Sequence, residues 1–339
     1  MSTAPAPVLE VSAVTTEIDT AQGTITPVAD VSFTIRSGET LCLVGESGSG
    51  KSMLALSLMR VLPPGARLVS GKVRLGDVEL TALPESEMRS LRGSRIAIVP
   101  QDPMTAFDPL LTVGAQIVET IQTHLRLSTK QARARMLTAL EQVRLPNPKR
   151  VAASLPSQLS GGMNQRALIA MAISTEPLVL LADEPTTALD VTVQAQVLEL
   201  LMEAQESRGL AVVLITHDMG VAAQVADQIA VMYAGQIVEH AAKHDLFAQP
   251  RHPYTVGLIN AAREAFSEST VFRSIPGAPP NLLALPAGCR FAPRCTHTRD
   301  ACVTAVPALR DFGPVRAACV LEDEERPWLS TTPHRSIVA

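Results

Sequence analysis

Eight residues near the start of the chain, Gly45–Ser52, constrain its fold more than any other segment. They read GESGSGKS and fit the pattern G-x-x-x-x-G-K-[ST] at every position. The apolar run Leu41–Val44 before them predicts a short buried strand, and the mostly apolar residues 52–62 after them predict a helix that ends at Pro63-Pro64. A glycine-rich turn between strand and helix directs backbone N–H groups at phosphate oxygens. The segment therefore predicts a site for nucleotide phosphates.

Two side chains at the end of this segment supply the expected chemistry. Lys51 brings a full positive charge to the β- and γ-phosphates, and the Ser52 hydroxyl is a hard oxygen ligand of the kind that Mg²⁺ prefers. We expect the whole segment to contact the nucleotide: Gly45, Glu46, Ser47, Gly48, Ser49, Gly50, Lys51 and Ser52.

Composition limits the remaining possibilities. Of 339 residues 46% are hydrophobic, which is enough for a large core, while aromatic residues make up 3% and the net charge is −4. Few aromatic rings and no basic excess argue against nucleic acid as a partner. No secretory signal is evident, and the apolar runs fall far short of the ~20 residues that cross a membrane. We expect a soluble, cytosolic chain that reaches a membrane only through a partner.

Apolar strands alternate with helical segments along the chain. This alternation predicts an α/β fold in which helices cover a parallel sheet. Strands are expected over residues 8–35 (with a turn at Gln22-Gly23), 41–44, 95–99, 178–182 and 211–216, and helices over about 102–170 and 191–207. Within 102–170, Ser128 and Gln131 fit a capping box, and Pro146 and Pro148 are expected to end the helix that follows it. After about residue 262 Pro and Arg become frequent, so we place a domain at 1–262 and a small irregular extension at 263–339.

Two further segments carry groups suited to a nucleotide. The apolar run from Val179 ends in the adjacent carboxylates Asp183 and Glu184; the first can hold Mg²⁺ through water, and the second can orient the attacking water. Ser160-Gly161-Gly162 precedes another helix and forms a second anion-binding helix start. One chain already has a complete phosphate segment, so this second site is best explained by a nucleotide bound to another subunit.

The order of these segments resembles the ATP-binding cassette (ABC) ATPases. The resemblance covers residues 8–262 and rests on the phosphate segment, Gln101 after a strand, Leu-Ser-Gly-Gly-Met at 159–163, Asp183-Glu184, Ala188-Leu189-Asp190 and His217. It implies a P-loop NTPase core with an antiparallel β subdomain and a helical subdomain at about 102–170. It also implies a head-to-tail dimer in which Ser160–Gly162 contact the ATP of the partner cassette.

The same resemblance implies roles for single residues. Gln101 would contact Mg²⁺ and the attacking water, His217 the γ-phosphate, and Asp190 the partner cassette. One feature departs from the family: Thr15–Gly23 contains no aromatic ring to stack on adenine, and Ile18 stands at that position.

Several segments are similar to the ATPases of dipeptide, oligopeptide and nickel importers. They are residues 101–110, 251–255, 275–277 and 288–295. The similarity implies a peripheral protein on the cytoplasmic face of the membrane. Its expected partners are a second ATPase, different or identical, two membrane permease subunits and an extracytoplasmic substrate-binding protein. The cargo would be a dipeptide or oligopeptide, with a nickel chelate or glutathione as alternatives. A soluble cassette acting on DNA or ribosomes is disfavoured by the negative charge, and a non-hydrolysing cassette by the presence of Lys51, Glu184 and His217.

Four of the five cysteines lie close together in the sequence: Cys289, Cys295, Cys302 and Cys319. Their spacing matches neither the C-x₂₋₄-C pairs of zinc sites nor the common bacterial iron–sulfur pattern, so spacing leaves a metal centre or reduced thiols open. The resemblance to peptide-importer ATPases implies a 4Fe-4S cluster, with Zn²⁺ as the alternative. We expect Arg290, Arg294 and Arg299 to balance the charge of the thiolates.

Overall fold

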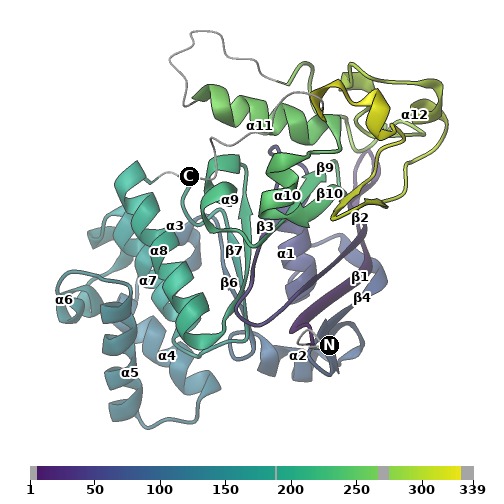
Figure 1. The fold of residues 1–339 in the computed structure, drawn as a ribbon. Coiled ribbons are helices and arrows are strands. Elements are labelled where there is room, and N and C mark those ends of the chain that lie inside the picture. The colour runs from purple at the N-terminus through teal and green to yellow at the C-terminus, as the bar shows by residue number, and fades with distance from the viewer. Residues whose placement is uncertain (1–5, 188, 266–274, 330–339) are drawn as a thin grey trace. The chain divides into compact units, whose positions relative to one another are not determined.

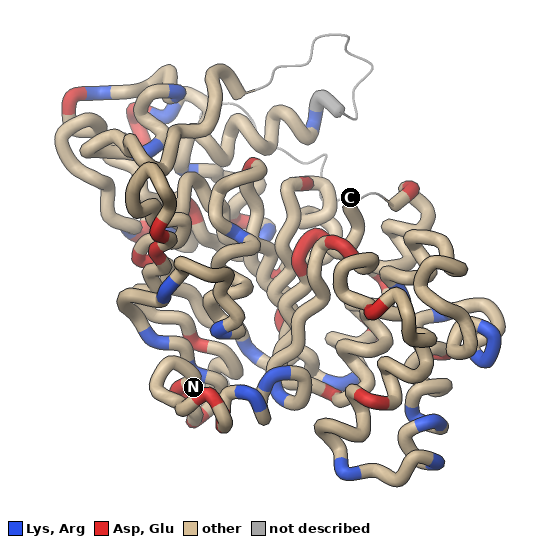
Figure 2. Tube along the Cα trace, turned by 180° about the vertical axis from the view of Figure 1, so that it is seen from behind, with Lys and Arg blue, Asp and Glu red and all other residues tan. Residues whose placement is uncertain are grey.

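The structure is a computed structural model that describes residues 6–187, 189–265 and 275–329. Its contacts divide the chain into two units. Unit 1 consists of residues 1–9, 34–39 and 74–215, and unit 2 of residues 10–33, 40–73 and 216–339. Lys and Arg are interspersed with Asp and Glu along the described chain, in keeping with the small net charge (Figure 2). No helix among the described residues is long and apolar enough to cross a membrane.

Unit 1 contains three parallel strands in the order β8-β7-β6: β6 (Ile96–Val99), β7 (Val179–Asp183) and β8 (Ala211–Thr216). Every residue of β7 and β8 is buried, which explains why these segments are nearly uninterrupted apolar runs. The two strands were predicted at 178–182 and 211–216. Because the strands are parallel, the residues that follow β6 and β7 leave the sheet at the same edge.

Helices make up most of the rest of unit 1. The predicted helical region is confirmed as separate helices, four of which (α4–α7) pack on one another (Figure 1). The capping box is present: the Ser128 hydroxyl accepts the N–H of Gln131, and the Gln131 amide oxygen accepts the N–H of Ser128. The elements are β5 (Val78–Glu79), η1 (Leu80–Ala82), α2 (Glu85–Leu91), α3 (Pro103–Ala106), α4 (Val113–His124), α5 (Thr129–Gln142), α6 (Pro148–Ala153), η2 (Pro156–Gln158), α7 (Gly161–Ile173) and α8 (Val191–Arg208).

The expectation that Pro146 and Pro148 end helix α5 is wrong. The helix ends at Gln142, and Arg144 adopts a left-handed backbone conformation with a φ of 52°. Pro148 instead begins α6, where its fixed φ suits a helix and its missing N–H costs no hydrogen bond.

Unit 2 contains a sheet in which β1 (Leu9–Thr20) lies between β2 (Gly23–Ile35) and β4 (Ala66–Leu75). Its second group of strands has the order β11-β12-β10-β9-β3. Strand β3 (Thr40–Val44) pairs in parallel with β9 (Gln228–Tyr233), and the remaining pairs are antiparallel: β10 (Gln236–Ala242), β12 (Val315–Ala317) and β11 (Arg310–Phe312). The last two strands belong to the extension, which sequence reasoning described as irregular.

The helices of unit 2 follow its strands. Helix α1 ends at Met59, three residues before the predicted end, because Arg60 adopts a left-handed conformation and its N–H caps the carbonyls of Leu56 and Ser57. The other elements are α9 (Met219–Val225), α10 (Lys243–Ala248), α11 (Pro253–Ala265), η3 (Ala292–Arg294), α12 (Asp300–Thr304), η4 (Asp323–Glu325) and η5 (Pro327–Leu329), and α1 itself spans Lys51–Met59. Helix α9 contacts β3 and α11, while α10 contacts β9 and β10.

Candidate functional site

The segment Gly45–Ser52, here called the phosphate loop, connects β3 to α1 in unit 2. The Lys51 ammonium lies across the loop. It donates to the carbonyls of Gly45 at 2.8 Å and Glu46 at 3.0 Å, and to the Ser49 hydroxyl at 3.3 Å. Lys51 is only 5% exposed, whereas Ser52 is exposed at the start of the helix. The structure therefore holds the loop's cation on the inner side of the turn, and Ser52 lies at the surface.

Glycine is required where the loop meets strand β2. Gly50 has a φ of 102°, and a Cβ at this position would lie 2.0 Å from the carbonyl oxygen of Pro27. Gly48 has a φ of 79°, but the space around its missing Cβ is open. Close packing on one side and open space on the other is the arrangement that a loop needs to wrap around a phosphate.

In unit 1, three side chains meet after the ends of β6 and β7. The Gln101 amide donates to a Glu184 carboxylate oxygen at 3.2 Å, and the Thr187 hydroxyl donates to the same oxygen at 2.7 Å. The Glu184 backbone is left-handed, with a φ of 46°, and its N–H donates to the carbonyl of Ile215 at 3.0 Å. Asp183, the last residue of β7, is buried. The structure thus brings together Gln101 and Glu184.

Ser160 and the two glycines form the start of helix α7. The Ser160 hydroxyl accepts the N–H of Met163 at 3.3 Å. A Cβ on Gly161 would meet no atom within 4 Å, whereas one on Gly162 would lie 2.8 Å from a methyl group of Val193. Gly162 therefore permits close packing against α8, while the backbone at Gly161 is open to approach from outside the unit.

The two other predicted residues lie at helix starts. Asp190 is exposed and caps α8 by accepting the N–H of Val193 at 3.0 Å; the neighbouring Ala188 lies outside the described residues. His217 is exposed, follows β8, and precedes Asp218, whose carboxylate caps α9. The residues predicted to act on the nucleotide are divided between the units. The phosphate loop and His217 belong to unit 2, and Gln101, Ser160–Gly162, Asp183, Glu184 and Asp190 belong to unit 1.

The four clustered cysteines of the extension line one small cavity, together with His252, Phe291 and His297. Burial raises the pKa of Cys289 to about 11 and also raises the pKa of Cys295 and Cys319. Among the described residues, no group of three His, Cys, Asp or Glu side chains is arranged to hold a single metal ion. The structure therefore gathers the predicted thiols, and their metal remains a prediction.

The expectation that three arginines balance the thiolates is wrong. Arg290 donates to the carbonyl of Ala234, Arg294 pairs with Glu46, and Arg299 pairs with Glu325 at 3.1 Å. These guanidinium groups therefore attach the extension to the rest of unit 2 or to itself. Spacing in the sequence could not show this, because a partner such as Glu46 is 248 residues away.

Comparison with known proteins identifies the family. The ABC transporter family matches residues 28–187, and the C-terminal region of oligopeptide/dipeptide transporters matches residues 238–302. The oligopeptide transport ATP-binding protein OppD of Salmonella typhimurium is 44% identical over 318 residues, which cover 94% of each chain. The chain belongs to the ABC transporter ATP-binding proteins. The dipeptide transport ATP-binding protein DppD of Bacillus subtilis is 46% identical over 301 residues, or 88% of this chain and 90% of that protein.

Solved structures confirm the predicted cassette fold. The ATP-binding cassette MJ0796, in a dimeric post-hydrolysis state with ADP and Pi, matches with a TM-score of 0.63 at 29% identity. The match covers 69% of this chain and 98% of that one. This ABC protein is therefore an ATPase of the cassette type, as the order of its motifs predicted.

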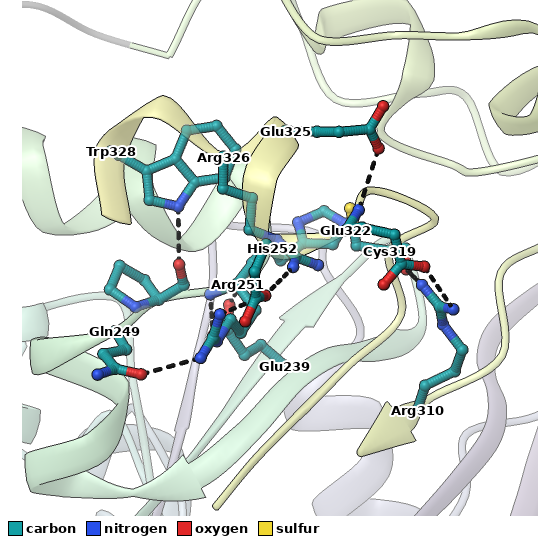
Figure 3. Close-up of polar contacts among 12 residues, drawn as sticks. Glu239, Gln249, Arg251, His252, Arg310, Cys319, Glu322, Glu325, Arg326 and Trp328 are labelled. Carbon is teal, nitrogen blue, oxygen red and sulfur yellow. Dashed lines mark hydrogen bonds and ion pairs between the residues drawn. The ribbon is translucent and has the colours of Figure 1, made fainter. Parts of the chain in front are cut away.

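Sequence reasoning missed a buried polar cluster of this ABC protein that joins β10 to residues 250–252, and these residues to the extension. Glu239 on β10 is fully buried, and its two carboxylate oxygens accept the backbone N–H groups of Arg251 at 2.6 Å and His252 at 2.8 Å. Buried Arg326 donates to the carbonyl of Arg251 at 3.0 Å, and Trp328 donates to the carbonyl of Pro250 at 2.8 Å (Figure 3). A buried carboxylate and a buried guanidinium leave no periodic signal in a sequence.

Proposed function

We propose that this ABC ATPase powers the uptake of oligopeptides or dipeptides through separate membrane subunits. The observation that carries the proposal is a complete phosphate loop in a chain whose residues 238–302 match the C-terminal region of oligopeptide/dipeptide transporters. Relatives with these cargoes in their names match over 90% or more of their own length. We assign residues 1–262 to the ATPase domain and residues 263–339 to an extension typical of this branch.

Within the ATPase, the phosphate loop binds ATP. Lys51 offsets the charge of the β- and γ-phosphates, and the backbone N–H groups of Gly45–Ser52 bind phosphate oxygens. Ser52 and Gln101 are the proposed ligands of Mg²⁺, which Asp183 holds through water; when bound, Mg²⁺ neutralises charge that develops on the phosphates. The hard oxygen atoms of these side chains suit that ion.

Hydrolysis needs a group that orients water, and Glu184 is suited to this role. It accepts the proton of the water whose oxygen attacks the γ-phosphorus; the bond to the β–γ bridging oxygen breaks, and ADP and phosphate form. The hydrogen bonds from Gln101 and Thr187 support the assignment, because they restrict the carboxylate to one orientation. His217 is proposed to contact the γ-phosphate.

A second cassette completes the site. We assign Ser160, Gly161 and Gly162 to the ATP bound by the partner ATPase, and Asp190 to the contact with that partner. The exposed Ser160 and the open space at Gly161 support this, because the start of α7 can accept an external anion. Whether the partner is identical or different, each cassette would supply one half of each site.

The work of hydrolysis must reach membrane permease subunits. The segment after Gln101 is suited to this, since Met104, Leu110 and Leu111 are 47%, 84% and 43% exposed. Exposed apolar side chains close to a residue of the hydrolytic site mark a docking surface that can respond to nucleotide. In this proposal the protein is peripheral on the cytoplasmic face of the membrane, and an extracytoplasmic binding protein selects the cargo.

The proposal is tested in the assembled transporter, reconstituted in vesicles with its binding protein. Peptides should stimulate ATP hydrolysis. Glu184→Gln should keep ATP binding and lower turnover by at least ~100-fold, because the general base is lost. The matched control is Glu199→Gln, which removes an exposed carboxylate that pairs with Arg144. Stimulation by nickel chelates or glutathione alone would assign another cargo, and wild-type turnover in Glu184→Gln would remove Glu184 from this role.

For the extension we propose a 4Fe-4S cluster bound by Cys289, Cys295, Cys302 and Cys319. Four cysteines around one cavity supply the number and type of ligands that such clusters use. A single Zn²⁺ with bonds of about 2.3 Å would require the sulfurs to converge on one point. Among the described residues no such group of three ligands is found, and the preference for a cluster over zinc rests on the resemblance to peptide-importer ATPases. Burial raises the pKa of Cys289, Cys295 and Cys319, so binding a cluster through their thiolates would release protons.

Anaerobic purification tests this proposal. The protein should be brown, absorb broadly near ~400 nm and contain about four irons per chain. Cys295→Ser should lose iron, whereas Cys42→Ala, which removes a thiol from strand β3, should keep it. Colourless protein with one tightly bound zinc per chain would favour the alternative. Metal-free protein whose stability is unchanged in Cys295→Ser would reject both metals.

A further inference from the structure

Glu46 is the only acidic residue of the phosphate loop, and an arginine of the extension pairs with it. The guanidinium of Arg294 donates to the two Glu46 carboxylate oxygens at 2.6 Å and 3.0 Å. The Arg294 side chain is 4% exposed, and the Glu46 side chain 29%. Two parallel hydrogen bonds between a buried guanidinium and a carboxylate fix the orientation of both groups.

Arg294 is itself held in place by the rest of unit 2. Its Nε donates to the carbonyl of Pro276 at 2.8 Å, and its Nη2 to that of Ile275 at 3.2 Å. The guanidinium carbon lies 5.8 Å from the centre of the Tyr233 ring and 5.9 Å from that of Phe291. The hydrogen bonds to Glu46 raise the pKa of Arg294 further above its ordinary value. The charge opposite Glu46 is therefore permanent and its position is fixed.

The backbone of Glu46 is held from the same side. Its N–H donates to the hydroxyl of Tyr254 on α11 at 2.8 Å. The Tyr254 ring packs against Tyr233 and Phe291, with centroids 4.6 Å and 5.4 Å apart. Main chain and side chain of the second residue of the loop are thus both fixed by groups outside the loop.

We propose that Arg294 is a positioning residue for ATP binding, which neutralises Glu46 and holds it away from the triphosphate. A free carboxylate in a loop that binds a highly negative ligand would repel that ligand, and like charges brought together at an interface weaken binding strongly. The pair with Arg294 removes this repulsion. The inference rests on the proposed role of the phosphate loop in binding ATP, and it gives the extension a direct part in that site.

Binding of Mg²⁺ with a non-hydrolysable ATP analogue to the full chain, measured by calorimetry, tests the proposal. Arg294→Gln should weaken affinity by about tenfold or more, equivalent to roughly 1.4 kcal/mol. Glu46→Gln/Arg294→Gln should recover most of it, because the repelling carboxylate is gone. The matched control is Arg299→Gln, which removes another arginine of the extension that is 54% exposed and pairs with Glu325; its affinity should stay within about twofold of wild type.

Two further measurements separate charge from damage to the fold. The deficit of Arg294→Gln should shrink as salt is raised, since salt screens repulsion between Glu46 and phosphate. Glu46→Gln alone, which keeps Arg294, should bind at least as tightly as wild type, and this test holds even where Arg294→Gln does not fold. A tenfold loss in Glu46→Gln, or a double variant as weak as Arg294→Gln, would overturn the proposal. Unchanged binding in Lys51→Ala would instead refute the ATP site itself.

Discussion

Replacing Arg326 by methionine should destabilise unit 2 by about 3 kcal/mol. The Arg326 side chain is fully buried and makes three kinds of contact. It donates to the carbonyl of Arg251 at 3.0 Å and to Asp323 at 2.6 Å, and its guanidinium carbon lies 4.3 Å from the centre of the Phe312 ring (Figure 3). Methionine extends only about as far as the Nε atom of arginine and can replace only the apolar part of these contacts.

The magnitude follows from what the substitution leaves behind. A hydrogen bond to a charged group contributes about 1.5–3 kcal/mol, and a buried carbonyl without its donor costs about 1–3 kcal/mol. A desolvated cation–π contact adds up to about 2 kcal/mol. Relief of the desolvation of the guanidinium offsets part of this sum, because buried charges are costly in themselves. Asp323 is 52% exposed, so water can solvate it after the change.

Differential scanning calorimetry of the full chain measures the effect. For a unit of roughly 150–250 residues, about 3 kcal/mol corresponds to a fall in Tm of about 6–12 °C. The matched control is Arg310→Met: Arg310 lies over the same Phe312 ring at 5.0 Å but is 44% exposed and pairs with exposed Glu322. Arg310 also donates to the carbonyl of Cys319 at 2.8 Å, so this variant should lose about 1–2 kcal/mol, still less than Arg326→Met. Equal shifts in the two variants would refute the claim that burial of Arg326 makes the difference.

Three other predictions concern the two units. Burial raises the pKa of the Glu239 carboxyl from 4.5 to about 7, so the folded protein holds this proton more tightly than the unfolded chain does. The stability that this proton contributes is lost as pH rises through this range, and the Tm of wild type should fall relative to that of Glu239→Gln. A Tm difference between the two proteins that stays constant from pH 4.5 to 7 contradicts this. Ser160→Arg should block hydrolysis at the site whose phosphate loop lies on the partner while ATP still binds to this chain; the reverse result in an assay of each site rejects the head-to-tail arrangement. Gly50→Ala should weaken ATP binding at least tenfold more than Gly48→Ala, because only Gly50 abuts the Pro27 carbonyl; equal losses argue against that steric cause.

The parts of the fold that the sequence predicted are those that depend on short-range patterns. The capping box at Ser128 uses atoms three residues apart, and the apolar run Ala211–Thr216 is a strand with the predicted bounds because both faces of that strand are buried. The phosphate loop is similar in one respect, since Lys51 donates to the carbonyls of Gly45 and Glu46 within the same eight residues. Local chemistry determines local structure in these places, and the family resemblance then orders them.

Long-range pairs could not be predicted in this way. Strands β11 and β12 have three residues each, too few to show a period, and β12 obtains its partner from β10 more than 70 residues earlier in the chain. The partners of the arginines near the cysteines also depend on long-range contacts. Opposite charge favoured the thiolates as their partners, yet Arg294 pairs with a carboxylate that only the tertiary fold brings to it. Charge complementarity predicts that an arginine has a partner, and topology decides which one.

The change in composition near residue 262 does not imply that the extension folds apart from the ATPase. Its short strand β12 needs the edge of β10, because three residues cannot form a stable sheet alone. In the opposite direction, Glu46 and Glu239 have arginines of the extension, Arg294 and Arg326, as charged neighbours. Without these arginines a carboxylate in the phosphate loop and another in the core of unit 2 would lose the positive charge that offsets their desolvation. The extension and the phosphate loop are therefore linked by direct contacts, and the change in composition falls within unit 2.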